Sequence, residues 1–144
     1  MAVTAKLYGK VFLALFNKEI DWLDDVIRAM LTTGYTPDQD VEDYVNDVRA
    51  FEVTGTAYVA DGEALSGKTI TYTAGTNIVK LDAADTQWLA STITADVAVV
   101  YDDTGVDATS ALIGYQDSDS NIVSTNGTWE IVWNASGIVQ ITVA

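Results

Sequence analysis

The segment VVYDDTG at residues 99–105 holds the residues of this chain that most resemble enzyme machinery. A hydrophobic strand that ends in Asp-Thr-Gly is the arrangement in which aspartic proteases present a catalytic carboxylate, which would here be Asp103. That chemistry needs two carboxylates that share a proton about 3 Å apart, so a short chain must dimerise or carry the motif twice. This chain contains one Asp-Thr-Gly, and Val106 follows it where those enzymes usually carry Ala or Ser. We therefore interpret Asp102, Asp103 and Gly105 as a polar turn after a buried strand, and we expect no catalytic residue.

The acidic segment DSDSN at residues 117–121 is a second candidate, because it has the D-x-D-x-N spacing of a calcium-binding loop. A working EF-hand loop also needs Gly at its sixth position and a bidentate Glu at its twelfth. Here those two positions hold Ile122 and Thr128. Asp, Ser and Asn are also ordinary hairpin-loop residues. We expect no specific metal site and no cofactor, and a weak structural ion in this loop is left open.

The four tryptophans are a third candidate, because aromatic rings can stack on sugars. In TWEIVW, the side chains of Trp129, Ile131 and Trp133 share one face of a predicted strand. Three large apolar side chains on one face are more often core, or a subunit contact, than a ligand-binding shelf. A carbohydrate-binding adhesion module is kept as an alternative function. The tryptophans in question are Trp22, Trp88, Trp129 and Trp133.

The composition excludes several other kinds of chemistry. The chain has no Cys and no His, which removes disulfides, thiolate nucleophiles and the commonest general base. It carries 21 acidic and 7 basic residues, for a net charge of −14. Such a surface repels phosphate backbones and anionic lipids, so we expect no nucleic-acid partner and no membrane partner. The apolar run VFLALF at residues 11–16 is too short for a signal peptide, and we expect the protein to be cytoplasmic when it is made.

The elements that must position these residues are mostly short β-strands. Apolar stretches are separated by turn dipeptides, such as Asp-Gly at 61–62 and Asn-Gly at 126–127, of which Asn-Gly is typical of a two-residue hairpin. Nine short strands at this spacing predict one all-β domain over residues 1–144, a mainly antiparallel β-sandwich. The predicted strands are 7–16, 26–33, 51–59, 68–73, 77–81, 95–101, 110–116, 127–133 and 137–143.

One segment departs from the β pattern. In TPDQDVEDYVNDV, the residues Val41, Tyr44, Val45 and Val48 fall at i, i+3, i+4 and i+7, which is the spacing of one helix face. The preceding Thr-Pro pair supplies a capping residue and a proline suited to the first helical position. The pattern predicts one short helix near 37–48 that lies against the sandwich.

Several longer phrases are similar to small structural proteins of tailed bacteriophages, which sit beside capsid genes and include head decoration (cement) proteins. The phrases are LFNKEIDW, MLTTGYTPDQD, EVTGTAYVADGEALSGKTITY and STITADVAVVYDDTG followed by ALIGYQD. The resemblance covers nearly the whole chain and rests on overall phrasing, because no catalytic signature is shared. It implies a virion component, with a capsid decoration protein that stabilises the assembled head as the leading expectation. A head-fibre, tail-tube or tail-tip component is the alternative, since the resemblance does not fix the position in the particle.

The resemblance also implies partners, which are the major capsid protein and further copies of the same chain. A homo-oligomer would be suited to capsid symmetry, and a trimer would suit three-fold positions. The predicted strand 7–16 places Tyr8, Phe12 and Phe16 on one face, with more aromatic surface than a solvated face usually keeps. We expect these three residues to contact another subunit or the capsid. The alternative is that this face belongs to the sandwich core.

Overall fold

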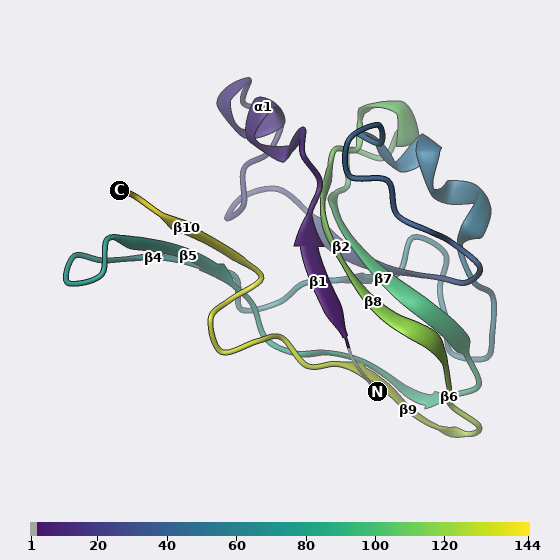
Figure 1. Cartoon of the computed structure of the whole chain (residues 1–144). Helices are drawn as coiled ribbons and strands as arrows, with labels where there is room; N and C mark the ends of the chain where they lie inside the picture. Colours follow the sequence, from purple (N-terminus) through teal and green to yellow (C-terminus); the bar gives the residue numbers. More distant parts are fainter. Residues whose placement is uncertain (1–2) are drawn as a thin grey trace.

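The computed structural model describes residues 3–144 and is built mainly from antiparallel β-strands (Figure 1). The largest sheet contains five strands in the spatial order β1 (Thr4–Leu7), β8 (Leu112–Val123), β7 (Thr94–Asp102), β2 (Ile27–Thr32) and β3 (Glu63–Ala64). A three-stranded sheet has the order β10 (Val139–Thr142), β5 (Ile78–Asp82) and β4 (Thr69–Thr73), and β6 (Thr86–Ser91) pairs with β9 (Gly127–Ile131). The predicted all-β class with mainly antiparallel pairing is confirmed.

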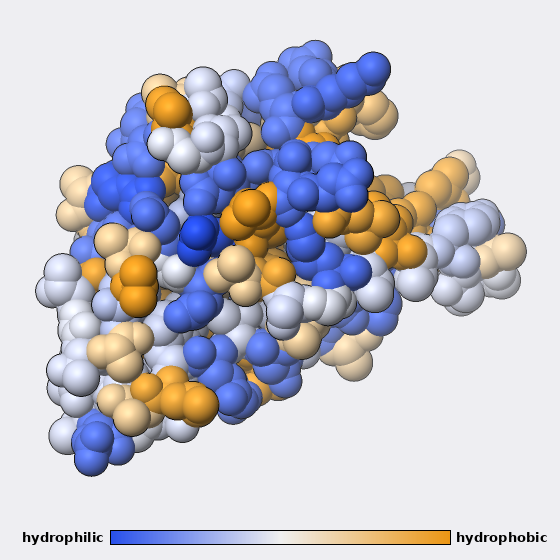
Figure 2. All heavy atoms as spheres, turned by 180° about the vertical axis from the view of Figure 1, so that it is seen from behind, coloured by the Kyte–Doolittle hydropathy of each residue, from blue (hydrophilic) through white to orange (hydrophobic). Residues whose placement is uncertain are grey.

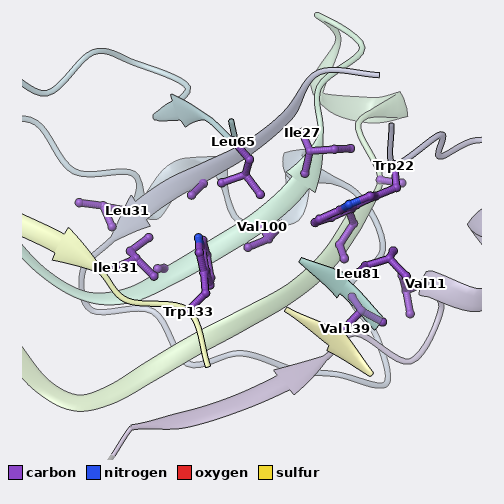
Figure 3. Close-up of a cluster of buried hydrophobic side chains, with 14 of the residues drawn as sticks. Val11, Trp22, Ile27, Leu31, Leu65, Leu81, Val100, Ile131, Trp133 and Val139 are labelled. Atoms are coloured by element: carbon purple, nitrogen blue, oxygen red, sulfur yellow. The ribbon is translucent and has the colours of Figure 1, made fainter. Parts of the chain in front are cut away.

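The five-stranded sheet is covered on both faces, and the side chains of β7 are apolar on each side. Its residues Ala98 and Val100 face a large sandwich core that also takes in side chains of the two smaller sheets, such as Leu81 and Ile131 (Figure 3). Its residues Val97, Val99 and Tyr101 face a second core. The second core is completed by the chain that follows β2, with Tyr35, Val45 and Val48. A strand that is buried on two sides explains the continuous apolar run at 97–101.

The predicted strand 7–16 is wrong, because the chain leaves the sheet after Leu7. Residues Val11–Phe16 form the short helix α1, which buries Val11 and Ala14 in the sandwich core. The Gly9 N–H donates to the carbonyl of Gln39 at 2.9 Å, so this turn is fixed against another segment instead of a neighbouring strand. A run that is apolar at almost every position satisfies the strand and the helix period equally. Its sequence therefore could not decide between them.

The predicted helix near 37–48 is also wrong. The segment forms a turn at 39–41 and two 3-10 helices, η1 (Val45–Asp47) and η2 (Arg49–Phe51). The backbone is held instead by the start of β8 and the residues just before it, since the Val45 N–H donates to the carbonyl of Ser110 and the Leu112 N–H donates to that of Asp43, both at 2.9 Å. These bonds use groups that an α-helix would need. Val45 and Val48 are buried as the pattern predicted, whereas Val41 is 66% exposed.

The structure differs from the sequence prediction in three further places. Residues 51–59 form no strand and contribute only isolated bridges from Glu52 and Thr56. The strands β3 and β6, all of β1 except Leu7, and the 3-10 helix η3 (Asp107–Thr109) were not predicted. Asn126 has a left-handed φ of 47°, but it joins β8 to β9, which lie in different sheets, so Asn-Gly does not close a hairpin between them.

Candidate interaction surface

Asp103 of the Asp-Thr-Gly segment is engaged on both carboxylate oxygens. It follows directly after β7, and its Oδ2 accepts a hydrogen bond from Nε of Arg28 at 2.6 Å. Its Oδ1 accepts the N–H of Gly105 at 2.9 Å, which closes a tight turn in which Gly105 has a φ of +79°. The carboxylate therefore holds a turn and pairs with a cation. This arrangement agrees with the interpretation of the segment as a polar turn.

Replacing Asp103 with Asn is expected to lower the free energy of unfolding by about 1.5–3 kcal/mol, the usual range for a hydrogen bond to a charged group. The amide oxygen can still accept the Gly105 N–H, so the loss comes from the ion pair with Arg28. Urea denaturation measures the change, with Asp103→Ala as the variant that loses both bonds. Cleavage of a peptide library by the wild-type protein, abolished in Asp103→Asn, would contradict the structural role.

The neighbouring Asp102 has a different environment, which sequence analysis missed by treating both aspartates as turn residues. Its side chain is on the buried face of the strand and is 2% exposed. One carboxyl oxygen, Oδ2, has no hydrogen-bond donor. Burial raises the pKa of Asp102 to about 7, assisted by a hydrogen bond and charge repulsion from Asp25 and opposed by the charge of Lys68. The alternation of strand faces was the available signal, because adjacent residues of a strand point in opposite directions.

The acidic segment 117–121 lies inside β8. Oδ1 of Asp117 accepts the N–H of Asp119 at 2.9 Å, and the Ser118 hydroxyl donates to the carbonyl of Asp96 at 2.8 Å. Asp119 has a left-handed φ of 56°, as in a turn. Within residues 3–144, no group of three or more Asp or Glu side chains is placed to hold a metal ion.

The four tryptophans all belong to the sandwich core, and none is more than 7% exposed. Trp88 and Trp129 meet edge to face, with ring centroids 5.8 Å apart. Trp22 and Trp133, whose side chains are labelled in Figure 3, donate their indole N–H groups to backbone carbonyls, each at 3.1 Å. Buried rings present no stacking platform to a sugar. The observation that favoured a carbohydrate-binding module is therefore explained by core packing.

The structure separates the three residues predicted to form a contact face. Tyr8 is fully buried in the second core, where its hydroxyl is 2.8 Å from that of Tyr35. Phe12 and Phe16 are one turn apart on α1 and are 37% and 85% exposed, and Leu13 beside them is 64% exposed. The prediction that the three residues share one face is therefore wrong, because the chain turns at Gly9 and continues as a helix. Two of the three residues nevertheless lie on an apolar surface.

The three-stranded sheet of β4, β5 and β10, which we call the arm, extends away from the five-stranded sheet (Figure 1). Its strand register places most apolar side chains on one face, and the threonines, Lys80 and Ile78 on the other. Near the body, Leu81 and Val139 of the apolar face are buried. On the edge strand β4, Ile70 and Tyr72 of the same face are 47% and 59% exposed. Figure 2 shows hydrophobic atoms along the arm and where it joins the body.

Helix α1 and the arm extend from the same end of the molecule, and Val11 of α1 lies near Leu81 and Val139 (Figures 1 and 3). Together they expose several large apolar side chains. Residues 66–81 also contain two lysines and no acid, in a chain with a net charge of −14. Clustered apolar surface of this kind is typical of protein contacts. The exposed apolar residues are Phe12, Leu13, Phe16, Ile70, Tyr72 and Val143.

The fold and this surface define the class of protein as an all-β protein with a projecting apolar arm. No family model matches the chain, and no curated protein or solved structure is significantly similar to it. Among residues 3–144, no helix is long and apolar enough to cross a bilayer.

Proposed function

We propose that this chain is a structural protein of a tailed-bacteriophage virion, which binds the assembled head as a homo-oligomeric decoration protein and stabilises it. The observation that carries the proposal is the exposed apolar surface of α1 and the arm on an otherwise strongly acidic protein. An isolated protein gains nothing from exposing Phe16 and Tyr72, whereas a protein that works in an assembly buries them against its partner. The resemblance in sequence phrasing to phage structural proteins supports the same conclusion.

The proposed partners are the major capsid protein and further copies of this chain, with no nucleic acid and no membrane. A decoration protein has to recognise a surface that exists only after the shell assembles. Several weak contacts from one oligomer then act together, because each bound subunit raises the effective concentration of the next. The role needs no catalysis, and the carboxylates that most resemble catalytic groups have structural partners, as Asp103 does with Arg28.

The proposal is tested by mixing labelled protein with purified undecorated expanded capsids and with purified tails, and then sedimenting each. We expect saturable binding to capsids at a fixed ratio to the major capsid protein, and decorated capsids should resist heat or chelator better than bare ones. The double variant Phe12→Ser, Phe16→Ser is the matched control. Both side chains are exposed, so the variant should fold normally and bind at least tenfold more weakly.

Two outcomes would replace the proposal. Binding to tails alone would assign the chain to the tail alternative. Binding to neither particle, with retention on a glycan array, would favour an adhesion module that uses surfaces other than the buried tryptophans.

A further inference from the structure

The outer strand of the arm, β4, is an open sheet edge without the usual protection. It pairs with β5 on one side, and no strand of residues 3–144 pairs with its other side. All five residues of its sequence TITYT are exposed. It contains no charge and no proline, and its pairing with β5 runs without a register shift. Natural edge strands normally carry a lysine, a proline or a bulge, because a bare edge pairs with other strands.

We infer that β4 pairs antiparallel with β4 of a second copy, so that two arms form one continuous six-stranded sheet. The inference adds to the proposed function the contact through which copies associate. The biological role of this dimer rests on the proposed function, whereas the contact itself does not. A two-fold contact gives a dimer, in place of the trimer that three-fold capsid positions would suit.

The sequence of β4 is complementary to itself in one register. When Thr71 lies opposite Thr71 of the second copy, all five residues of each strand are paired. Ile70 then lies opposite Tyr72 of the other copy, on the apolar face, and Thr69 lies opposite Thr73 on the polar face. Aromatic residues next to β-branched ones and Thr next to Thr are favourable cross-strand pairs. A register shifted by one residue would place apolar side chains opposite threonines of the other face.

The distribution of charge favours contact between two copies at the β4 edge. Two chains with a net charge of −14 repel each other, and they approach most easily where acid is absent. Residues 66–81 contain Lys68 and Lys80 and no acid. By contrast, the two edge strands of the five-stranded sheet each carry a charge within the strand, which is Glu63 in β3 and Lys6 in β1. Because the two bodies still repel, salt should strengthen the dimer.

Cysteine cross-linking tests the register directly, because the chain has no cysteine of its own. In the inferred dimer, residues at position 71 are directly opposite, about 4.5–5.5 Å apart between Cα atoms, which suits a disulfide. Thr71→Cys should therefore form a covalent dimer on mild oxidation. Thr73→Cys is the matched control, since it is equally exposed on the same face. Its two copies would be four residues apart along the strands, about 13 Å, and should cross-link at least tenfold more slowly.

The unmodified protein should sediment at twice its 15.5 kDa mass, more completely at high salt than at low salt. Thr71→Lys, which places like charges opposite each other, should remain monomeric and keep the far-UV circular dichroism spectrum of the wild type. A monomer at all concentrations and both salts would overturn the inference, as would a dimer that persists in Thr71→Lys or equal cross-linking of the two cysteine variants. These measurements use purified protein without capsids. Their failure is therefore distinguishable from failure of the proposed function, which the sedimentation with capsids measures.

Discussion

Asp102→Asn is expected to stabilise the protein at about pH 8 and to leave its stability nearly unchanged at about pH 4. Asp102 is buried beside Asp25, and its pKa is raised from the ordinary value of 3.8 to about 7. The folded chain therefore keeps this proton up to about pH 7, whereas the unfolded chain releases it near pH 4. Asparagine is neutral at every pH and has nearly the same shape as the protonated acid, so it mimics the form that the fold prefers.

The sign of the pH dependence follows from the raised pKa. Below about pH 4 both states hold the proton, and Asp102 contributes its full stability. As pH rises from about 4 to 7, only the unfolded state loses the proton, so the stability of the folded state falls. Above pH 7 the loss is constant. One pKa unit corresponds to about 1.4 kcal/mol, so the gain from Asp102→Asn at pH 8 should be roughly 2–4 kcal/mol.

Denaturant unfolding of the wild type and the variant at both pH values measures this difference. Because the other acids titrate equally in both proteins, their contributions cancel in the comparison. Asp103→Asn is the control, since it changes the adjacent residue, whose carboxylate is paired with Arg28, and should destabilise at pH 8. If Asp102→Asn destabilises by the same amount at both pH values, Asp102 is ionised in the folded protein and its environment differs from the one described.

The strands that the sequence predicted correctly are those whose pattern is decided locally. β2, β7 and the first residues of β8 are mainly apolar and buried on both sides, and β4 alternates cleanly between apolar and polar residues. The errors arise where partners distant in sequence decide the conformation. Residues 37–48 have a helical period, but the start of β8 and the residues just before it bind their backbone groups. No local pattern contains that information.

The candidate surface was predictable only in part, for a related reason. Alternation in β4 and β5 identifies an apolar face, but it does not tell whether another layer covers that face. The same pattern describes Leu81, which is buried, and Ile70, which is 47% exposed. Phe12 and Phe16 were predicted as contact residues because they share a face of the predicted strand 7–16, and both are exposed on α1. Their contact with another subunit or the capsid stays a prediction. Tyr8 was grouped with them through the strand period, and the turn at Gly9 removes it from the surface.

Gly62→Ala is expected to destabilise the protein strongly, more than most other substitutions that add a single methyl group. Gly62 lies beside β2, directly before β3, and its φ is +75°. A Cβ atom there would lie 2.0 Å from the carbonyl oxygen of Ala29 and 2.8 Å from Cα of Met30, both backbone atoms of β2. The turn is also held from two sides, since Arg28 donates to the Gly62 carbonyl at 3.2 Å and the Tyr101 hydroxyl donates to that of Asp61 at 2.8 Å. The methyl group can therefore be accommodated only by moving the turn off the sheet.

Gly34→Ala separates the two causes of this loss. Gly34 has a similar φ of +66°, but no atom lies within 4 Å of the position that its Cβ would take. It should lose only the cost of a left-handed conformation, about 1–2 kcal/mol. Gly62→Ala should lose that amount and about 1–3 kcal/mol more for overpacking, roughly 2–5 kcal/mol in all. Urea unfolding of both variants at one pH measures the difference. Equal losses would mean that backbone conformation alone requires glycine at position 62, and that the turn at 61–62 does not press against Ala29.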